Sequence, residues 1–384
     1  MKSKFIPIAL CALLAAGMAF ADGYRVTLGT APDSFPLVVV KGTPYEMGLA
    51  QGKLLKNEVK AVLKSYLGLA QKGDAEHFSN AQLDAAWNSI KPYTSDRFVQ
   101  ELHGLADGAG LDFQMVLRAH MVPVVAPYAC SGAAAWGSAT KNGDLYQFRN
   151  LDYTMSSHLQ DHPAVVIYLP NKGIPVMNVS FAGCIGSNTG MNADGIALTE
   201  MGDSPASDRP YDLNGEHFTT MFRDILFNAH NLDEAVSIIK KAKRIKKYHF
   251  IVGDGTTKSA VKMLAHAPNL TIWHQDDPSD EVAPNILKNV VYNCEGRDPI
   301  GYAYLKRYHG SYDMDSMIQL SKAVGTRHGN LLAAVYDATT LDAYIAYALD
   351  DQCAYRRPYV HVNMKDYLDF NKIPAGAKVF REHE

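Results

Sequence analysis

The spacing of apolar residues changes once along this chain of 384 residues, and that change limits the folds open to it. Between Thr43 and about Val122, apolar side chains recur every three or four residues, as they do in amphipathic helices. After residue 130, short apolar runs are joined by turns such as Asn142-Gly143, the strongest short signal for a β-hairpin. Strands and helices do not alternate regularly, and no segment repeats. The sequence therefore predicts an α+β fold, with helices layered on antiparallel sheets in one compact unit.

Local signals place the expected elements. Thr43, Pro44 and Glu46 have the order of an N-cap, a first helical position and a capping box, so we expect a helix from here to about Gly73. Further helices are expected at about 80–91, 96–105, 112–121, 216–229 and 232–239. Hairpins are expected from 133–140 with 145–149, 165–169 with 176–181, 249–252 with 260–265, and 331–336 with 343–348.

The N-terminal segment 1–21 has the order of a secretory signal peptide. Lys2 and Lys4 precede an apolar run, and Ala19-Phe20-Ala21 offers small residues where a signal peptidase cuts, before Asp22. The apolar run is too short to anchor the protein, and no later stretch approaches the length of a membrane helix. We therefore expect a secreted or periplasmic protein without a membrane span.

Composition argues against some partners, but it does not decide whether the cysteines form disulfides. Of the residues, 47% are hydrophobic and 20% charged, as in a globular protein, and a net charge of −3 argues against nucleic-acid binding. The basic run at 240–247 follows an expected helix, whose C-terminus favours cations. Four cysteines remain after the signal peptide, and they form either two disulfides or thiols with another role: Cys130, Cys184, Cys294 and Cys353.

Two motifs resemble ligand sites but lack what those sites need. The segment 253–259 ends like a phosphate-binding loop, yet it has no glycine directly before Lys258 and no helix pattern after it. His158 and His162 are four residues apart in a segment without helical periodicity, so they are interpreted as surface histidines. The sequence predicts neither a metal site nor a cofactor.

Cys130 is the strongest candidate for chemistry. It stands where the helical half gives way to the hairpins, and its neighbours in the segment 129–133 are small enough for a substrate carbonyl to approach. The turn at 142–143 folds the strand of Arg149 back beside Cys130, where a guanidinium lowers the pKa of a thiol. Asp152 follows, and its carboxylate could hold an ammonium group. The alternative is a buried or disulfide-bonded Cys130 with a surface ion pair of Arg149 and Asp152.

The segment 130–152 resembles the nucleophile hairpin of the family typified by acyl-coenzyme A:6-aminopenicillanic acid acyltransferase. That family is related to the choloylglycine (bile salt) hydrolases and belongs to the N-terminal-nucleophile (Ntn) hydrolases. Three further segments match it in order: Lys41-Gly42-Thr43-Pro44-Tyr45-Glu46-Met47-Gly48 with Gln51-Gly52, then Gly190-Met191-Asn192-Ala193-Asp194-Gly195-Ile196 within a central strand over 186–197, then Val290-Val291-Tyr292-Asn293-Cys294.

The resemblance implies a four-layer αββα sandwich and a precursor that cuts itself between Ala129 and Cys130. The products would be a helical, propeptide-like α chain of 22–129 and a β chain of 130–384, which remain one unit as a heterodimer; further oligomerisation is left open. The free α-amino group of Cys130 would be the base for its own thiol, since its ordinary pKa lies near 8. Arg149 and Asp152 would assist, and Asn293 would help to bind the oxyanion.

The chain departs from the family pattern at two places. The relatives carry a second catalytic arginine after the strand that ends in Asn293, and here both Arg297 and Arg307 are candidates. Glu200 lies in a segment where relatives tend to have an asparagine. Asn192 is a weaker candidate, because a role in the turn before Gly195 suits it better than substrate contact.

Three functions follow from these residues. The leading one is an exported cysteine amidohydrolase or acyltransferase that cleaves a small linear amide, such as an N-acyl amino acid, a peptide, a β-lactam or a bile-salt conjugate. An ester or phospholipid hydrolase on the same scaffold would use the same acyl-enzyme chemistry. A non-catalytic periplasmic binding protein with two disulfides is the third.

Overall fold

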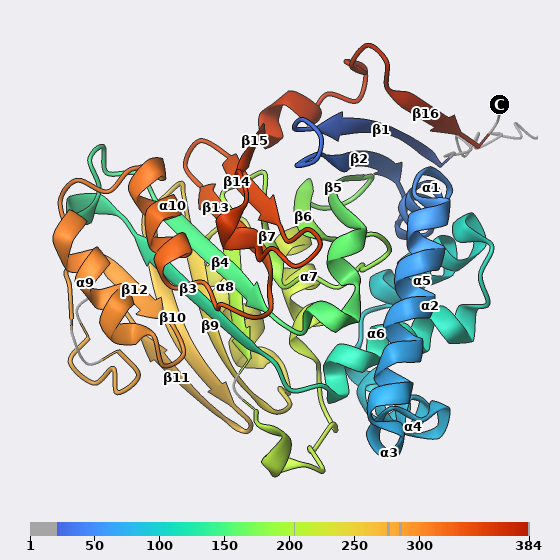
Figure 1. Ribbon diagram of the computed structural model, residues 1–384, viewed down its shortest axis with the longest axis horizontal. Coiled ribbons are helices and arrows are strands. Elements are labelled where there is room, and N and C mark those ends of the chain that lie inside the picture. Colours follow the sequence, from blue (N-terminus) through green and yellow to red (C-terminus); the bar gives the residue numbers. More distant parts are fainter. Residues whose placement is uncertain (1–20, 203, 275–276, 284–285, 383–384) are drawn as a thin grey trace, which may run out of the picture.

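The computed structural model describes residues 21–202, 204–274, 277–283 and 286–382 (Figure 1). The predicted signal peptide lies outside these residues, apart from Ala21. Of the helices within them, none has both the length and the apolar character needed to cross a membrane.

The described residues form two sheets, one of ten strands and one of six. All neighbouring strands are antiparallel except β2 and β5, which run parallel. The larger sheet has the order β11 (Asn269–Trp273), β10 (Ser259–His266), β9 (Lys247–Asp254), β8 (Ile196–Gly202), β7 (Thr189–Asn192), β6 (Val176–Phe181), β5 (Pro163–Pro170), β2 (Phe35–Gly42), β1 (Asp22–Leu28) and β16 (Lys378–Arg381). The smaller has the order β12 (Val290–Asn293), β3 (Ala129–Ala135), β4 (Tyr146–Asp152), β13 (Asn330–Asp337), β14 (Asp342–Tyr347) and β15 (Val360–Asn363).

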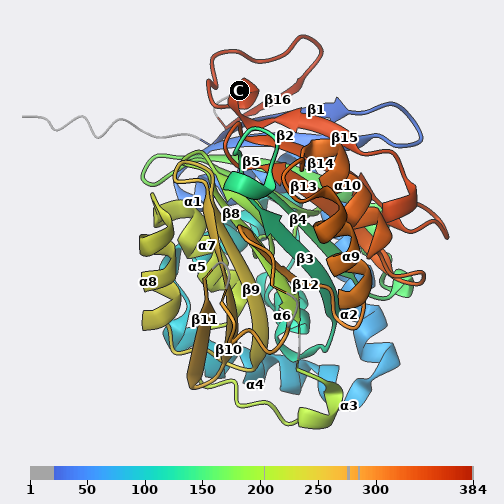
Figure 2. The ribbon, with the colours of Figure 1, turned by 90° about the vertical axis from the view of Figure 1, so that its left-hand side faces the viewer.

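The two sheets pack face to face, with β3 and β4 against β8, and helices cover their outer faces. Helices α9 (Asp298–Tyr308) and α10 (Met314–Ala323) lie on the smaller sheet, and α7 (Phe218–Asn228) and α8 (Leu232–Lys241) on the larger (Figure 2). The predicted α+β class and its four-layer αββα sandwich, the layer order of the Ntn hydrolases, are therefore confirmed. Apolar side chains fill the space between the layers, which stabilises the sandwich.

The part of the chain before Cys130 is mostly helical, as expected, but it begins with two strands that the sequence analysis missed. Strand β2 pairs with β5 and β1 pairs with β16, so segments on both sides of Cys130 share one sheet. The helices that follow are α1 (Pro44–Leu54), α2 (Lys56–Gly73), α3 (Ala75–Phe78), α4 (Asn80–Ile90), α5 (Asp96–Ala109) and α6 (Phe113–Val125).

Helices α1 and α5 lie unusually close, because glycines line both sides of their contact (Figure 1). A Cβ atom built on Gly104 would lie 2.0 Å from the carbonyl oxygen of Tyr45, and one on Gly48 would lie 2.2 Å from that of Glu101. Only glycine allows so close an approach of two backbones. Gly48 and Gly52 therefore have a packing role, which ties α1 to α5.

Most expected elements form, with two corrections. The capping box of Thr43 and Glu46 is present, and all four expected hairpins are formed. The helix expected to reach Gly73 is instead two helices, α1 and α2, which meet at Leu55. The single central strand expected over 186–197 does not form. Strand β7 ends at Asn192, a hairpin turn follows, and β8 begins at Ile196.

Candidate active site

The predicted hairpin positions Cys130 and Arg149 in the centre of the smaller sheet. Strands β3 and β4 pair so that Cys130 lies opposite Leu151 and Gly132 opposite Arg149. Gly132 also faces the larger sheet, where a Cβ atom on it would lie 2.4 Å from a methyl group of Thr199. A glycine here lets the two sheets approach each other.

Arg149 is fully buried, and each of its side-chain nitrogens has a partner. Nη2 donates to Sγ of Cys130 at 3.0 Å and to Oε2 of Glu200 at 3.1 Å. Nε donates to the carbonyl oxygen of Glu200 at 2.9 Å, and Nη1 to Oγ1 of Thr189 at 2.8 Å. Strands β7 and β8 of the larger sheet thus fix the guanidinium that faces the thiol.

Burial governs the charges at this centre. It raises the pKa of Glu200 to about 7, although Arg149 and the hydroxyl of Tyr128, 3.0 Å from Oε1, both lower it. Burial also raises the pKa of the Cys130 thiol above its ordinary value, and this effect outweighs the positive charge of Arg149. Arg149 therefore lowers the pKa of this thiol, as expected, but by less than burial raises it.

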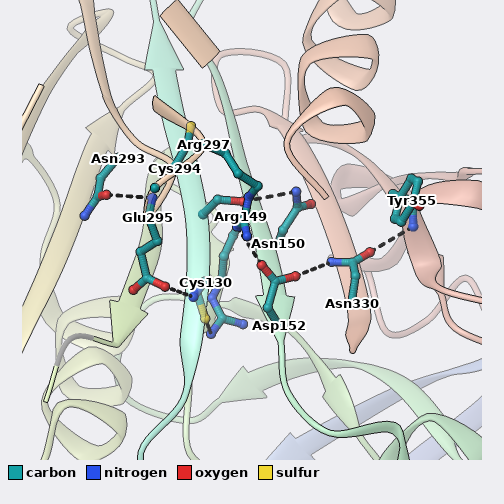
Figure 3. Close-up of polar contacts among 12 residues, drawn as sticks. Cys130, Arg149, Asn150, Asp152, Asn293, Cys294, Glu295, Arg297, Asn330 and Tyr355 are labelled. Atoms are coloured by element: carbon teal, nitrogen blue, oxygen red, sulfur yellow. Dashed lines mark hydrogen bonds and ion pairs between the residues drawn. The ribbon is translucent and has the colours of Figure 1, made fainter. Parts of the chain in front are cut away.

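Asp152 lies at the end of β4, opposite Ala129, yet its carboxylate contacts other residues (Figure 3). Oδ2 accepts a hydrogen bond from Nη2 of Arg297 at 2.8 Å, and Oδ1 accepts one from Nδ2 of Asn330 at 3.0 Å. Burial raises the pKa of Asp152, while Arg297 and Asn330 lower it. Asp152 thus joins β4 to β13 and to the loop that carries Arg297.

The turn after β12 brings the side chain of Glu295 to Cys130, whereas the hydrogen bond of the Asn293 side chain lies within that turn. Asn293 is opposite Gly132 on the strand beside β3, and its Oδ1 accepts a hydrogen bond from the backbone N–H of Glu295 at 3.1 Å. Oε2 of Glu295 in turn accepts a hydrogen bond from the backbone N–H of Cys130 at 3.0 Å (Figure 3). That N–H belongs to the peptide bond at which cleavage is predicted.

The structure separates the three weaker candidates. Arg297 reaches the site through Asp152, whereas Arg307 is exposed near the end of α9 and lies over the ring of Tyr308. Asn192 is buried away from Cys130. Its Nδ2 donates to the carbonyls of Leu226 and Ala229, and its Oδ1 accepts from the backbone at the β7–β8 turn. These are the contacts of a residue that supports a turn.

A largely apolar pocket adjoins the hairpin. It lies between the helical segment that precedes Cys130 and the sheets that follow it, and it includes both Tyr128 and Leu151, the cross-strand partner of Cys130. Its apolar lining includes Leu63, Tyr66, Ala119, Phe181 and Phe218. A pocket of this kind binds an apolar group and excludes water from it.

The remaining motifs have structural roles. The cysteines at 130, 184, 294 and 353 are free thiols, so no disulfide forms among the described residues. His158 pairs with Asp161 on the surface. In the basic run, Arg244 donates to the carbonyl oxygens of Ile239 and Ala242 at the end of α8, as the helix dipole favours. Asp254 accepts from the backbone of its own turn, as a hairpin residue does.

Sequence reasoning missed three polar contacts of the site, those of Thr189, Glu200 and Glu295. Glu200 stood out only because it replaces an expected asparagine. The sequence around Glu200 on β8 gives no sign that its side chain meets an arginine from the other sheet. Glu295 adjoins Asn293, but its reach to Cys130 depends on β12 lying beside β3.

The geometry can be compared with known proteins. Residues 138–276 match the family model described as acyl-coenzyme A:6-aminopenicillanic acid acyl-transferase. The matched segment includes Arg149, Asp152 and Glu200 but neither Cys130 nor Asn293. The match confirms the predicted resemblance, and it supports an enzyme of the hydrolase or acyltransferase class.

Individual relatives and solved structures are only distantly similar to the chain. It is 26% identical to protein dcd1A of Dictyostelium discoideum over 398 residues, which covers 93% of this chain and 86% of that protein. An N-acylethanolamine-hydrolyzing acid amidase ortholog of Caenorhabditis elegans aligns with a TM-score of 0.44 and 17% identity, over 60% of this chain and 98% of that one. Penicillin V acylase of Agrobacterium tumefaciens aligns with a TM-score of 0.44 and 14% identity, over 65% of this chain and 90% of that one.

Proposed function

We propose that the chain is an exported precursor that cuts itself between Ala129 and Cys130, and that Cys130 is then the nucleophile of an amidohydrolase or acyltransferase. One observation carries the proposal. Both reactive atoms of Cys130 are held by charged side chains: Sγ by Arg149 at 3.0 Å and the backbone nitrogen by Glu295 at 3.0 Å. A buried structural cysteine needs neither contact.

The proposed cleavage begins when Sγ of Cys130 attacks the carbonyl carbon of Ala129. The peptide C–N bond breaks, the nitrogen takes the thiol proton, and a thioester joins Ala129 to Cys130. Water then hydrolyses the thioester. Ala129 is left with a carboxylate, and Cys130 with a free thiol and a free α-amino group.

The same two atoms serve in turnover. The α-amino group takes the thiol proton, and the thiolate attacks the carbonyl carbon of the substrate amide. The oxyanion that forms is stabilised by Asn293 and by backbone N–H groups. The leaving amine takes the proton back from the α-ammonium group, and a thioester remains on Cys130. Water resolves it in hydrolysis, and a second amine resolves it in acyl transfer.

The substrate proposed for this site is an N-acyl amide with an apolar acyl group. The pocket beside the hairpin supports an apolar acyl group, since aromatic and aliphatic side chains from α2, β6 and α7 line it. The named activities of the amidase and acylase described above are those of the compared proteins. They suggest N-acylethanolamines and penicillins for the first panel to test, beside the N-acyl amino acids expected from the sequence.

The two chains of the cleaved protein are proposed to stay together. Strands β1 and β2 of the first chain would remain inserted in the larger sheet, between β5 and β16 of the second. Removing them would expose hydrogen-bonding strand edges and a large apolar core, so dissociation should require unfolding.

Two alternatives remain testable. An ester hydrolase would use the same acyl-enzyme, so the assay panel should contain matched esters and amides. The binding-protein alternative relied on two disulfides, and the described cysteines are all free.

Intact-mass analysis under denaturing conditions tests the proposal. We expect a chain that begins Cys-Ser-Gly-Ala, and a single uncut chain without activity for Cys130→Ala. Full activity in an uncut wild-type chain would overturn the self-cleavage.

A further inference from the structure

The carboxylate nearest to the nitrogen of Cys130 is that of Glu295. The position of Asp152 after Arg149 on the hairpin predicted it as the carboxylate for the new ammonium group. In the structure Oε2 of Glu295 accepts the N–H of Cys130 at 3.0 Å. Both oxygens of Asp152 instead accept hydrogen bonds from the side chains of Arg297 and Asn330. Figure 3 shows Glu295 reaching Cys130 from one side and Asp152 turned to the other.

The backbone of Glu295 adopts a conformation that residues other than glycine rarely adopt. Glu295 has a φ of +44° and Gly296 a φ of +77°, both in the left-handed region that favours glycine. A glutamate there costs conformational energy that glycine would avoid, and such strain collects at functional sites.

The loop that holds Glu295 is fixed on both sides. The N–H of Glu295 itself donates to Oδ1 of Asn293. The N–H groups of Cys294 and Gly296 donate to the carboxylate of Asp298 at 2.8 Å and 3.2 Å. These hydrogen bonds fix the backbone from which the carboxylate of Glu295 reaches the N–H of Cys130.

We infer that Glu295 holds the nitrogen of Cys130 both before and after cleavage. This inference rests on the proposed function. Before the cut, Glu295 fixes the amide nitrogen that becomes the leaving group. After the cut, it accepts an N–H of the α-amino group, which leaves the nitrogen lone pair for the thiol proton. Glu295 gains and loses no proton. It positions the base and stabilises the ammonium form.

Other charges also face Cys130, and they determine how the test must be designed. They are Arg149 and Asp152 from β4, Glu200 from β8, and Glu295 itself. The three carboxylates would each favour an ammonium group, and Arg149 would disfavour it. The effect of Glu295 must therefore be measured against a matched removal of charge at Asp152.

The test compares Glu295→Gln with Asp152→Asn, in protein labelled with 15N-cysteine. In the cleaved protein, the α-amino nitrogen of Cys130 is the one cysteine nitrogen that is an amine rather than an amide, so its titration can be followed directly. Removing an adjacent opposite charge lowers the pKa of an ammonium group, here by about one unit or more. We expect that fall for Glu295→Gln, a smaller one for Asp152→Asn, and a matching shift of the acid limb of kcat/KM to lower pH.

The possible outcomes separate this inference from the proposed function. An unchanged midpoint in Glu295→Gln, or a larger shift in Asp152→Asn, overturns the role of Glu295. A wild-type protein without an amine resonance overturns self-cleavage instead. A folded but uncut Glu295→Gln supports the role before cleavage. If that variant does not fold, Glu295→Asp replaces it, because its shorter side chain must also shift the midpoint if the contact matters.

Discussion

The side chains of Arg149 and Glu200 form an ion pair between the two sheets, with Nη2 3.1 Å from Oε2 and neither side chain exposed. Two buried charges of opposite sign compensate each other, and each becomes costly when its partner is removed. The guanidinium that faces the thiol of Cys130 is therefore fixed by the opposite sheet, so the site depends on how the two sheets pack.

Replacing Arg149 by alanine should affect both activity and stability. We expect turnover to fall by two orders of magnitude or more, because the thiol loses its only adjacent cation among the described residues. The free energy of unfolding should fall by about 3 to 5 kcal/mol, because Glu200 is left buried without its partner. Activity on the amide panel and urea denaturation check the two effects. Unchanged turnover would remove Arg149 from the mechanism.

The pKa of Glu200 predicts a pH dependence of stability. Burial raises this pKa from 4.5 to about 7, so the folded state binds the proton more tightly than the unfolded state does. The resulting stabilisation is complete below about pH 4.5 and is lost as the pH rises through about 7. Glu200→Gln should lack this contribution, because its amide does not titrate.

Melting temperatures from pH 4.5 to 8 test this pH dependence. The wild type should lose stability with rising pH relative to Glu200→Gln. A difference between the two proteins that stays constant, or that changes in the opposite direction, would contradict the raised pKa.

Asp152 and Arg297 should behave as one unit. Nη2 of Arg297 lies 2.8 Å from Oδ2 of Asp152. Hydrogen-bonded neighbours typically show coupling energies of about 0.5 to 3 kcal/mol. In a double-mutant cycle of Asp152→Asn and Arg297→Met, we expect the double variant to be little worse than Asp152→Asn alone. Additive losses of stability and turnover would show that Arg297 acts independently.

Arg307→Met is the matched control for Arg297→Met. Arg307 is exposed and contacts the ring of Tyr308, so its replacement should change stability by no more than about 0.5 kcal/mol and leave turnover unchanged.

Local signals in the sequence were sufficient to predict an element where one short segment determines its own structure. Thr43 with Glu46 specifies a cap, and Asn142-Gly143 specifies the turn that brings Arg149 beside Cys130. The N-terminal strands were missed because β2 pairs with β5, whose residues lie more than a hundred positions away in the chain. No local pattern encodes that pairing.

The same reason explains which site residues could be predicted. Cys130, Arg149 and Asp152 share one hairpin, so their proximity follows from the sequence. Glu200 reaches Arg149 only because the sheets stack, and Glu295 reaches Cys130 only because β12 joins the edge of the smaller sheet. The contact of Asp152 with Asn330 could not be predicted, because Asn330 comes from β13, far along the chain.

The observed contact of Asn293 and its proposed role at the oxyanion can be distinguished by one pair of variants. Its Oδ1 accepts the N–H of Glu295, which supports the loop, and its Nδ2 is the group proposed to stabilise the oxyanion. Asn293→Ala removes both. Asn293→Asp keeps the oxygen acceptor but replaces the amide donor with a carboxylate oxygen, which repels an oxyanion. Loss of one preorganised donor typically lowers kcat by about 100- to 1,000-fold. Loss of the loop hydrogen bond costs about 1 kcal/mol of stability.

We expect both variants to lose kcat to this extent with little change in KM, and only Asn293→Ala to lose the stability of the loop hydrogen bond. Titration of Cys130 with a thiol reagent should show an intact nucleophile in both, since Arg149 and not Asn293 contacts its sulfur. Measuring kcat and melting temperature on the same preparations separates the roles. If Asn293→Asp turns over substrate at the wild-type rate, Nδ2 does not bind the oxyanion, and the contact of Asn293 with Glu295 is its function.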